Sequence, residues 1–262
     1  MDIVVCIKQV PGTTRVEIDE TTGVLRRDRA EAKLNPYDLY ALETALRLRE
    51  RYGGVVKVIT MGPPNAVDII KEAYATGADE GYILTDAAFA GSDTLATSYA
   101  LSQGIRRSGG YDLIVCGRQT TDGDTAQAGP ETAEFLSIPH VSNVTEVVSI
   151  DARRVTLIAE TEETRYTLEA PLPCLITVDK GSVMPRLPSY KKMVASADKS
   201  ITRYGLDDLY DTDPANYGLR GSPTNVINIF PPERSAGLVK LTGDGRAVAE
   251  QLFTLLTKLK HI

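Results

Sequence analysis

The 262-residue sequence contains no tryptophan, only two histidines and only three cysteines. With His140 and His261 as its only imidazoles, a Ser-His-Asp triad or a histidine-rich metal site is not expected. The cysteines Cys6, Cys116 and Cys174 lack metal-ligand spacing, and each lies in or beside an apolar run. We interpret them as buried thiols in a reducing cytoplasm, and we assign neither a metal ligand nor a catalytic residue.

Long apolar runs, a basic surplus and a positively charged leader are also missing. No run approaches the ~18–20 apolar residues that a membrane-spanning helix needs. The formal net charge of −6 argues against nucleic acid and against an acidic membrane surface as partners. The N-terminus begins at once with a strand-like run instead of a signal peptide. These features predict a cytoplasmic protein without a membrane span.

Strand-like apolar runs alternate with helical patterns over roughly the first half of the chain. This rhythm predicts an α/β fold with a right-handed, doubly wound parallel sheet, Rossmann-like and of the adenine nucleotide alpha hydrolase type. Added antiparallel strands are predicted by the runs at 141–150, 153–161 and 164–169, and another buried strand by the run at 174–178. A hairpin is predicted at 16–27, and a single strand at 226–230. We expect a nucleotide-binding domain at 1–185, followed by an extended, partner-contacting arm at 186–262 that ends in an amphipathic helix.

The stretch from Asp112 to Pro139 carries the clearest candidate binding site. Its apolar strand ends at Gly117, and a small, polar loop leads to a helical pattern that starts near Ala126. Such a strand–loop–helix unit can hold phosphate with backbone N–H groups and the helix dipole, so we predict a site for the phosphates of an adenine-containing cofactor. The residues expected to contribute are Gly117, Arg118, Gln119, Thr120, Thr121, Gly123, Thr125 and Gln127.

The same loop also fits an ordinary turn that ends in a helix cap. It lacks both the Gly-Lys-Ser/Thr end of a Walker A loop and the GxGxxG fingerprint. Asp122 and Asp124 would repel an anion unless they face outward, cap the helix, or bond a sugar or a partner group. The loop residues alone leave both interpretations open.

Other strand ends should meet this loop, because the carboxyl ends of parallel strands gather at one edge of the sheet. Lys8 and Met61 follow two of the strand-like runs. Ser92 is expected to cap the helix that follows it, and together with Thr94 it can form a second polar wall. A nucleotide at this edge would therefore touch several loops at once.

Asn35-Pro36 predicts a helix start, with Asn35 as the capping side chain and Pro36 in the first turn. Asp38 favours the positive end of the same helix dipole. Leucines at helical spacing face inward, which leaves Glu43 and Glu50 on the expected solvent face.

Taken together, these segments resemble the small (beta) subunit of electron transfer flavoproteins. The resemblance runs in order through most of the chain. It is carried by VVCIKQVPGT (4–13), LNPYDLYALETAL (34–46), VITMGP (58–63), GADEGYILTD (77–86), FAGSDTLATS (89–98), CGRQTTDGDTAQAGP (116–130) and PLPCLITVDKG (171–181) followed by PRLPS (185–189).

The resemblance implies a heterodimer with an alpha subunit that carries a mobile FAD. It also implies that the beta subunit holds an adenine nucleotide, and Cys6, Asn35–Asp38, Met61 and Gly117–Ala128 match the family's binding positions. In ordinary members that nucleotide is structural AMP. In electron-bifurcating members it is a second FAD that accepts hydride from NADH, and the form DGDTAQAGP is similar to theirs.

A bifurcating member would send one electron to ferredoxin or flavodoxin and the other, through the alpha-subunit FAD, to a partner flavin dehydrogenase. Family members dock acyl-CoA dehydrogenases through an exposed leucine after a Pro-Arg motif. Here Pro185-Arg186 leads to Leu187-Pro188-Ser189-Tyr190, and Tyr190 falls near the place of that leucine. The resemblance therefore implies docking of an acyl-CoA dehydrogenase or, because of this departure, of another partner. Two alternatives stay open: a non-bifurcating subunit with AMP, and a stand-alone adenine-nucleotide-binding domain.

Overall fold

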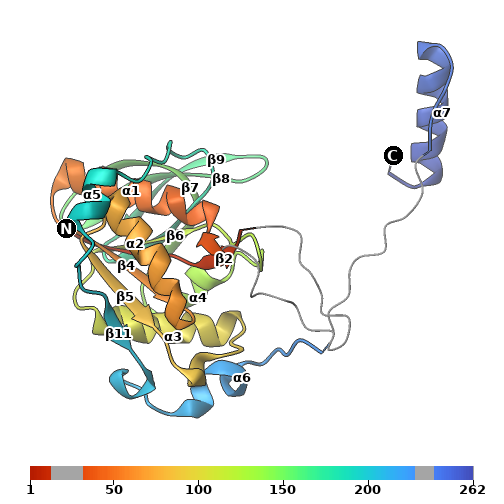
Figure 1. The fold of residues 1–262 in the computed structure, drawn as a ribbon. Helices are drawn as coiled ribbons and strands as arrows, with labels where there is room; N and C mark the ends of the chain where they lie inside the picture. The colour runs from red at the N-terminus through yellow and green to blue at the C-terminus, as the bar shows by residue number, and fades with distance from the viewer. Residues whose placement is uncertain (13–31, 228–238, 262) are drawn as a thin grey trace. The chain divides into compact units, whose positions relative to one another are not determined.

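A computed structural model describes residues 1–12, 32–227 and 239–261 (Figure 1). The chain forms two compact units, Met1–Val226 and Ile227–Ile262. The second unit holds helix α7 (Gly245–Lys258), whose first turn is capped by Asp244 as predicted. The predicted hairpin at 16–27 and most of the predicted strand at 226–230 lie outside the described residues.

A nine-stranded sheet forms the centre of the first unit (Figure 1). Its spatial order is β11 (Thr202–Tyr204), β5 (Glu80–Leu84), β4 (Val55–Met61), β1 (Asp2–Cys6), β6 (Leu113–Gly117), β10 (Cys174–Val178), β7 (His140–Ile150), β8 (Arg154–Glu160) and β9 (Arg165–Pro171). All neighbours from β11 to β7 pair in parallel, and β8 and β9 add antiparallel pairs. The predicted fold class is therefore confirmed. A short ribbon, β2 (Gln9–Pro11) and β3 (Ala32–Leu34), lies outside this sheet.

Helices cover both faces of the sheet because its central strands are apolar on both faces. Ile3 and Val5 of β1 pack in one core with α1 (Pro36–Tyr52) and α2 (Val67–Thr76). Val4 points the other way, into a second core with α3 (Thr94–Arg107) and α4 (Ala128–Leu136). None of the described helices is long and apolar enough to cross a membrane.

The first unit continues past residue 185, the boundary suggested by the sequence. Helix α5 (Tyr190–Ala195) packs on α2, and β11 adds a parallel strand beside β5. Three-residue 3-10 turns (Leu206–Asp208 and Pro214–Asn216) and α6 (Gly218–Gly221) follow. The Tyr217 ring is buried 5.4 Å from the rings of both Phe89 and Tyr99. Scattered apolar residues that lack a periodic pattern thus complete the second core.

Three expectations about helix residues were wrong. Asp93, not Ser92, caps α3 by accepting from the backbone N of Ala96, while the Ser92 hydroxyl donates to a preceding carbonyl. Asn35 occupies the cap position of α1, but its side chain makes no capping bond. Glu43 is 3% exposed instead of solvated, because arginine side chains surround its carboxylate.

Candidate functional site

The carboxyl ends of β1 and β6 lie side by side where the connections of the sheet reverse direction. The chain leaves β1 through α1 toward β4, and later returns through α3, on the other face, to β6. Cys6 pairs in register with Cys116, so Lys8 and the loop after Gly117 leave the sheet at the same edge. In doubly wound sheets, ligands bind outside the strand ends at this switch point.

Asp38 connects these two strand ends to the first turn of α1. The residue is 4% exposed, and its carboxylate accepts from the backbone N of Lys8 (2.8 Å), from Asn35 Nδ2 (2.9 Å) and from the backbone of Gly117. Burial raises the pKa of Asp38 to about 7, against the lowering effect of these hydrogen bonds. Position 117 has to be glycine, because a Cβ there would overlap Asp38 Oδ1 and lie 2.8 Å from the Tyr37 carbonyl carbon.

Asn35 fixes the loop after β6 to the start of α1. Its buried amide donates from Nδ2 to the carbonyl of Gln119 (2.9 Å), and its Oδ1 accepts from the backbone N of Thr121 (3.3 Å). The side chains of Asn35 and Asp38, both predicted to contact the cofactor, thus use their polar atoms on the protein itself. They shape the loop that the ligand would meet.

Both carboxylates that would oppose an anion in this loop are paired within the protein. Lys8 Nζ lies 2.8 Å from each oxygen of Asp122, and Gln119 Nε2 donates to Asp124. Burial alone would raise the pKa of Asp122, but the ammonium of Lys8 and further hydrogen bonds hold it below its ordinary value. Asp122 is thus neutralised by an ion pair, whereas Asp124, bonded only to a neutral amide, keeps its negative charge.

The remaining loop residues are polar and mostly exposed. The Thr120 hydroxyl accepts from the backbone N of Gly123 (3.3 Å), and Asp124 and Ala126 have φ values of 54° and 56°. Helix α4 begins at Ala128, slightly later than predicted, and its cap residue Gln127 makes no side-chain capping bond. Backbone N–H groups of an uncapped first turn can take an anion. Thr121 and Thr125 of the loop are exposed.

The start of α3 supplies the second predicted wall. Thr94 is the first residue of α3, and its hydroxyl lies 3.4 Å from Glu131 of α4. The buried hydroxyl of Ser98 donates to the other oxygen of that carboxylate (3.0 Å), which ties the two helices together. Ser92 precedes α3 and Met61 ends β4, and both are half-buried. Glu131 adds a third acid near the loop that sequence reasoning missed.

A further wall comes from the residues after β10. The Arg118 guanidinium lies 2.6 Å from Asp179, and Arg118 donates its backbone N–H to the last residue of that strand. Lys180 Nζ sits 4.2 Å from the centre of the Tyr37 ring. Asp179 and Lys180 were missed in the sequence, although their position directly after a strand-like run places them at the same edge of the sheet.

Two of the three cysteines, Cys116 and Cys174, are weak nucleophiles. A hydrogen bond with Cys6, burial and the nearby Asp38 all raise the pKa of the Cys116 thiol. Cys174 lies in the core of β10, and burial raises its pKa to about 11. Thiols that stay protonated are poor metal ligands and poor nucleophiles. No group of three or more His, Cys, Asp or Glu side chains in the described part of the chain could hold a metal ion.

The residues predicted to dock a partner lie on a different segment from these loops. Leu187 is 87% exposed and Tyr190 is 77% exposed, and Met184 before them is equally open. The backbone of this segment is bound to α2 through Ser189, whose N–H donates to the carbonyl of Ala75 (2.9 Å). It is not part of the switch-point site.

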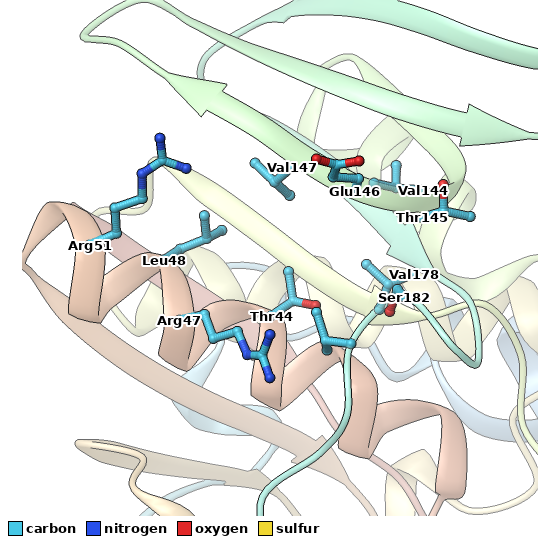
Figure 2. Close-up of a pocket in the computed structure, with 11 residues that line it drawn as sticks. Thr44, Arg47, Leu48, Arg51, Val144, Thr145, Glu146, Val147, Val178 and Ser182 are labelled. Atoms are coloured by element: carbon cyan, nitrogen blue, oxygen red, sulfur yellow. The ribbon is translucent and has the colours of Figure 1, made fainter.

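A separate hollow of about 300 Å³ lies between α1 and the strands β7 and β10 (Figure 2). Leu48, Val147 and Val178 form apolar walls, and Arg51 extends from α1 at one end. The buried hydroxyl of Thr44 has no hydrogen-bond partner among the described residues. None of the predicted site residues lines this hollow, so it is distinct from the site at the sheet edge.

Comparison with known proteins gives consistent matches over most or all of the chain. The family model for the electron transfer flavoprotein domain matches residues 22–209. The chain is 46% identical over 265 residues to the electron transfer flavoprotein subunit beta of Clostridium acetobutylicum, covering 100% of this chain and 98% of that protein. It is 43% identical over 238 residues to protein FixA of Sinorhizobium fredii, covering 88% and 84%. It is 40% identical over 262 residues to the caffeyl-CoA reductase-Etf complex subunit CarD of Acetobacterium woodii, covering 100% and 98%.

Proposed function

The chain belongs to the electron transfer flavoprotein family as a beta subunit that pairs with an alpha subunit, and we propose that its switch-point site holds FAD. The observation that carries this proposal is the loop after Gly117. It leaves β6 beside β1, the carboxylate of Asp122 is ion-paired with Lys8, Asp124 is bonded to the amide of Gln119, and the helix that the loop enters lacks a side-chain cap. This arrangement leaves backbone N–H groups for a pyrophosphate.

The residues divide into three parts of the proposed site. Gly117 and Cys6 form the floor above Asp38, and Met61 borders it from β4. Polar groups from the loop and from α3 would take the phosphates and the sugar. These are Arg118, Thr120, Thr121, Gly123, Thr125 and Gln127 from the loop, with Ser92 and Thr94 from the second wall. Lys8 and Asp122 close the β1 side by their ion pair.

FAD in this site would take hydride from NADH and divide the electrons between ferredoxin or flavodoxin and, through the alpha-subunit FAD, a partner dehydrogenase. The chain itself supplies binding, orientation and electrostatics, and no side chain is assigned as acid or base. The similarity to CarD, a subunit named for a caffeyl-CoA reductase complex, supports a flavin dehydrogenase of CoA thioesters as the partner. We assign its docking to Leu187 and Tyr190.

Structural AMP in a non-bifurcating subunit is the second candidate. Lys8 is already neutralised by Asp122, and Glu131 stands near the start of α4, so the site offers less positive charge than a pyrophosphate would favour. A single phosphate at α4 would suit that balance. The third possibility, a stand-alone nucleotide-binding domain, is disfavoured by the full-length similarity to beta subunits.

The nucleotide content of the purified heterodimer tests the proposal. We expect two FAD per heterodimer, no AMP, and reduction of both flavins by NADH. One FAD with one AMP and no response to NADH would select the second candidate, and one FAD without another nucleotide would refute the site.

A matched pair of variants locates the nucleotide. Gly123→Asp adds a charge inside the loop, whereas Gly110→Asp adds the same charge before β6, where a Cβ would meet no atom within 4 Å. Only Gly123→Asp should lower the retained nucleotide, by about tenfold or more in affinity, because a carboxylate placed against phosphate costs over 1 kcal/mol. Equal retention by the two variants would place the nucleotide elsewhere.

A further inference from the structure

Arg186 joins the docking segment, defined here as residues 184–190, to the middle of α1. Its Nε lies 2.7 Å from Glu43 Oε2, and its Nη1 lies 2.5 Å from Glu50 Oε1. Nη2 contacts the second oxygen of each acid, at 3.2 Å and 3.1 Å. The backbone N of Arg186 also donates to Glu43 (3.1 Å). One guanidinium therefore holds two carboxylates that are two helical turns apart.

The inner half of this cluster is withdrawn from water. Glu43 is 3% exposed, and the Arg186 side chain is 28% exposed. Burial would raise the pKa of Glu43, but the hydrogen bonds from Arg186 and Arg47 more than offset it, so the pKa lies below its ordinary value. The bond from Arg186 also lowers the pKa of Glu50. Removing Arg186 would leave the buried carboxylate of Glu43 with Arg47 as its remaining cationic partner.

Other bonds fasten the segment on both sides of Arg186. Arg47, itself 2.7 Å from Glu43, donates to the carbonyl of Met184 (3.3 Å). Ser189 donates its backbone N–H to α2, and Lys192 Nζ lies 2.9 Å from the carbonyl of Thr76 at the end of that helix. Leu187 and Tyr190, nearly free of contacts, lie between these anchors. A tethered backbone that carries exposed apolar side chains is the arrangement of a preset docking surface.

We propose that Arg186 is a positioning residue that holds the docking segment against α1, so that Leu187 is presented to the partner dehydrogenase in one conformation. The proposal rests on the docking role assigned above to Leu187 and Tyr190. Ordering a loop on binding costs affinity, and a segment that is already fixed avoids that cost. Arg186 acts through Glu43 and Glu50, and it need not touch the partner.

The test uses the purified heterodimer with Arg186→Gln, Arg186→Lys and Leu187→Ala, and with Arg154→Gln as the control. Arg154 forms an exposed ion pair with Glu169, away from the docking segment. Hydrogen–deuterium exchange of peptides covering 184–192 reports the tether. Steady-state electron transfer with a purified acyl-CoA dehydrogenase gives KM and kcat for that protein as the docking probe.

Arg186→Gln should speed exchange in 184–192 by about tenfold or more and raise KM by a similar factor, with kcat and flavin content unchanged. Arg186→Lys keeps the charge but loses the two-pronged geometry, so it should fall between wild type and Arg186→Gln. Leu187→Ala should raise KM without faster exchange, and Arg154→Gln should change neither.

Unchanged exchange in Arg186→Gln would overturn the proposal, and so would faster exchange with an unchanged KM. A wild-type heterodimer that shows no saturable transfer to the dehydrogenase would instead refute the proposed partner class. In that case the exchange result alone still decides whether Arg186 tethers the segment.

Discussion

Replacing Gly117 with alanine probes the floor of the proposed site most directly. The new methyl carbon would lie 2.8 Å from both the carbonyl carbon and the Cβ of Tyr37, and it would overlap Oδ1 of Asp38. Real Cβ atoms essentially never come this close to other atoms. Tyr37 belongs to the first turn of α1, and Asp38 is held by three hydrogen bonds, so neither neighbour can simply rotate away.

The cost follows from what has to move. Overpacking a buried site by one methyl group costs about 1–3 kcal/mol. If Asp38 shifts and loses one of its hydrogen bonds, about another 1 kcal/mol is added. Gly117→Ala should therefore destabilise the fold by about 2–4 kcal/mol and lower the melting temperature by roughly 5–15 °C for a chain of this size.

Gly123→Ala is the matched control, because the nearest atom to its new Cβ is Thr120 Oγ1 at 3.4 Å, an ordinary contact. It should stay within about 1 kcal/mol of wild type. The assay is thermal unfolding of the purified heterodimer at one fixed concentration, followed by far-UV circular dichroism. If the two variants melt within 1–2 °C of each other, the close approach of β6 to α1 is not what requires glycine at position 117.

Two more predictions concern the side chains beneath the loop. The pKa of Asp38 is raised from 3.8 to about 7 by burial, so the folded state binds the proton more tightly than the unfolded state does. Stability should fall as pH rises from about 4 to about 7, by at most about 4 kcal/mol. Asp38→Asn should lack this fall. The measurement is the unfolding free energy of wild type and of the variant at pH 5 and at pH 8. If the unfolding free energy changes equally with pH in both proteins, the raised pKa of Asp38 is contradicted. Asn35→Ala removes the bonds to Gln119 and Thr121, so it should lower the free energy of unfolding by about 2–3 kcal/mol and weaken nucleotide binding. Unfolding measures the first effect, and calorimetric titration of AMP into nucleotide-free heterodimer measures the second. A nucleotide affinity equal to that of wild type would refute the role of Asn35 in holding the loop.

The sequence predicted the sheet well because its signal is local. Each central strand is a continuous apolar run, and glycine or a capping residue separates it from the next helix. The segment after Val178 gave no such signal. β11 is only three residues long, and Tyr217 is buried by contacts with Phe89 and Tyr99, more than a hundred residues earlier in the chain. Burial that depends on distant partners does not leave a periodic pattern.

The sequence predicted where the candidate site residues lie in the fold better than it predicted their contacts. Gly117 and the loop after it emerge where the argument from strand ends placed them. The side chains of Asn35 and Asp38 turned inward, because the first turn of α1 lies directly against the end of β6 and their polar atoms are needed there. Glu43 was assigned to solvent because charged residues on a helix usually face water. Its partner Arg186 is far away in sequence, and only the fold brings the two together.

Helix α1 serves both proposed surfaces of this subunit. Its first turn carries Asp38, which supports the cofactor floor, and its later turns carry Glu43 and Glu50, which hold the docking segment. At 1.5 Å per residue, Asp38 and Glu50 are about 18 Å apart along the helix axis. The helix is packed along its length against the sheet, where Leu42 and Leu46 are fully buried. Because one packed helix supports both, the docking segment and the cofactor floor are held by the same rigid element, and a dehydrogenase docked at Leu187 as proposed would meet a surface fixed relative to that floor.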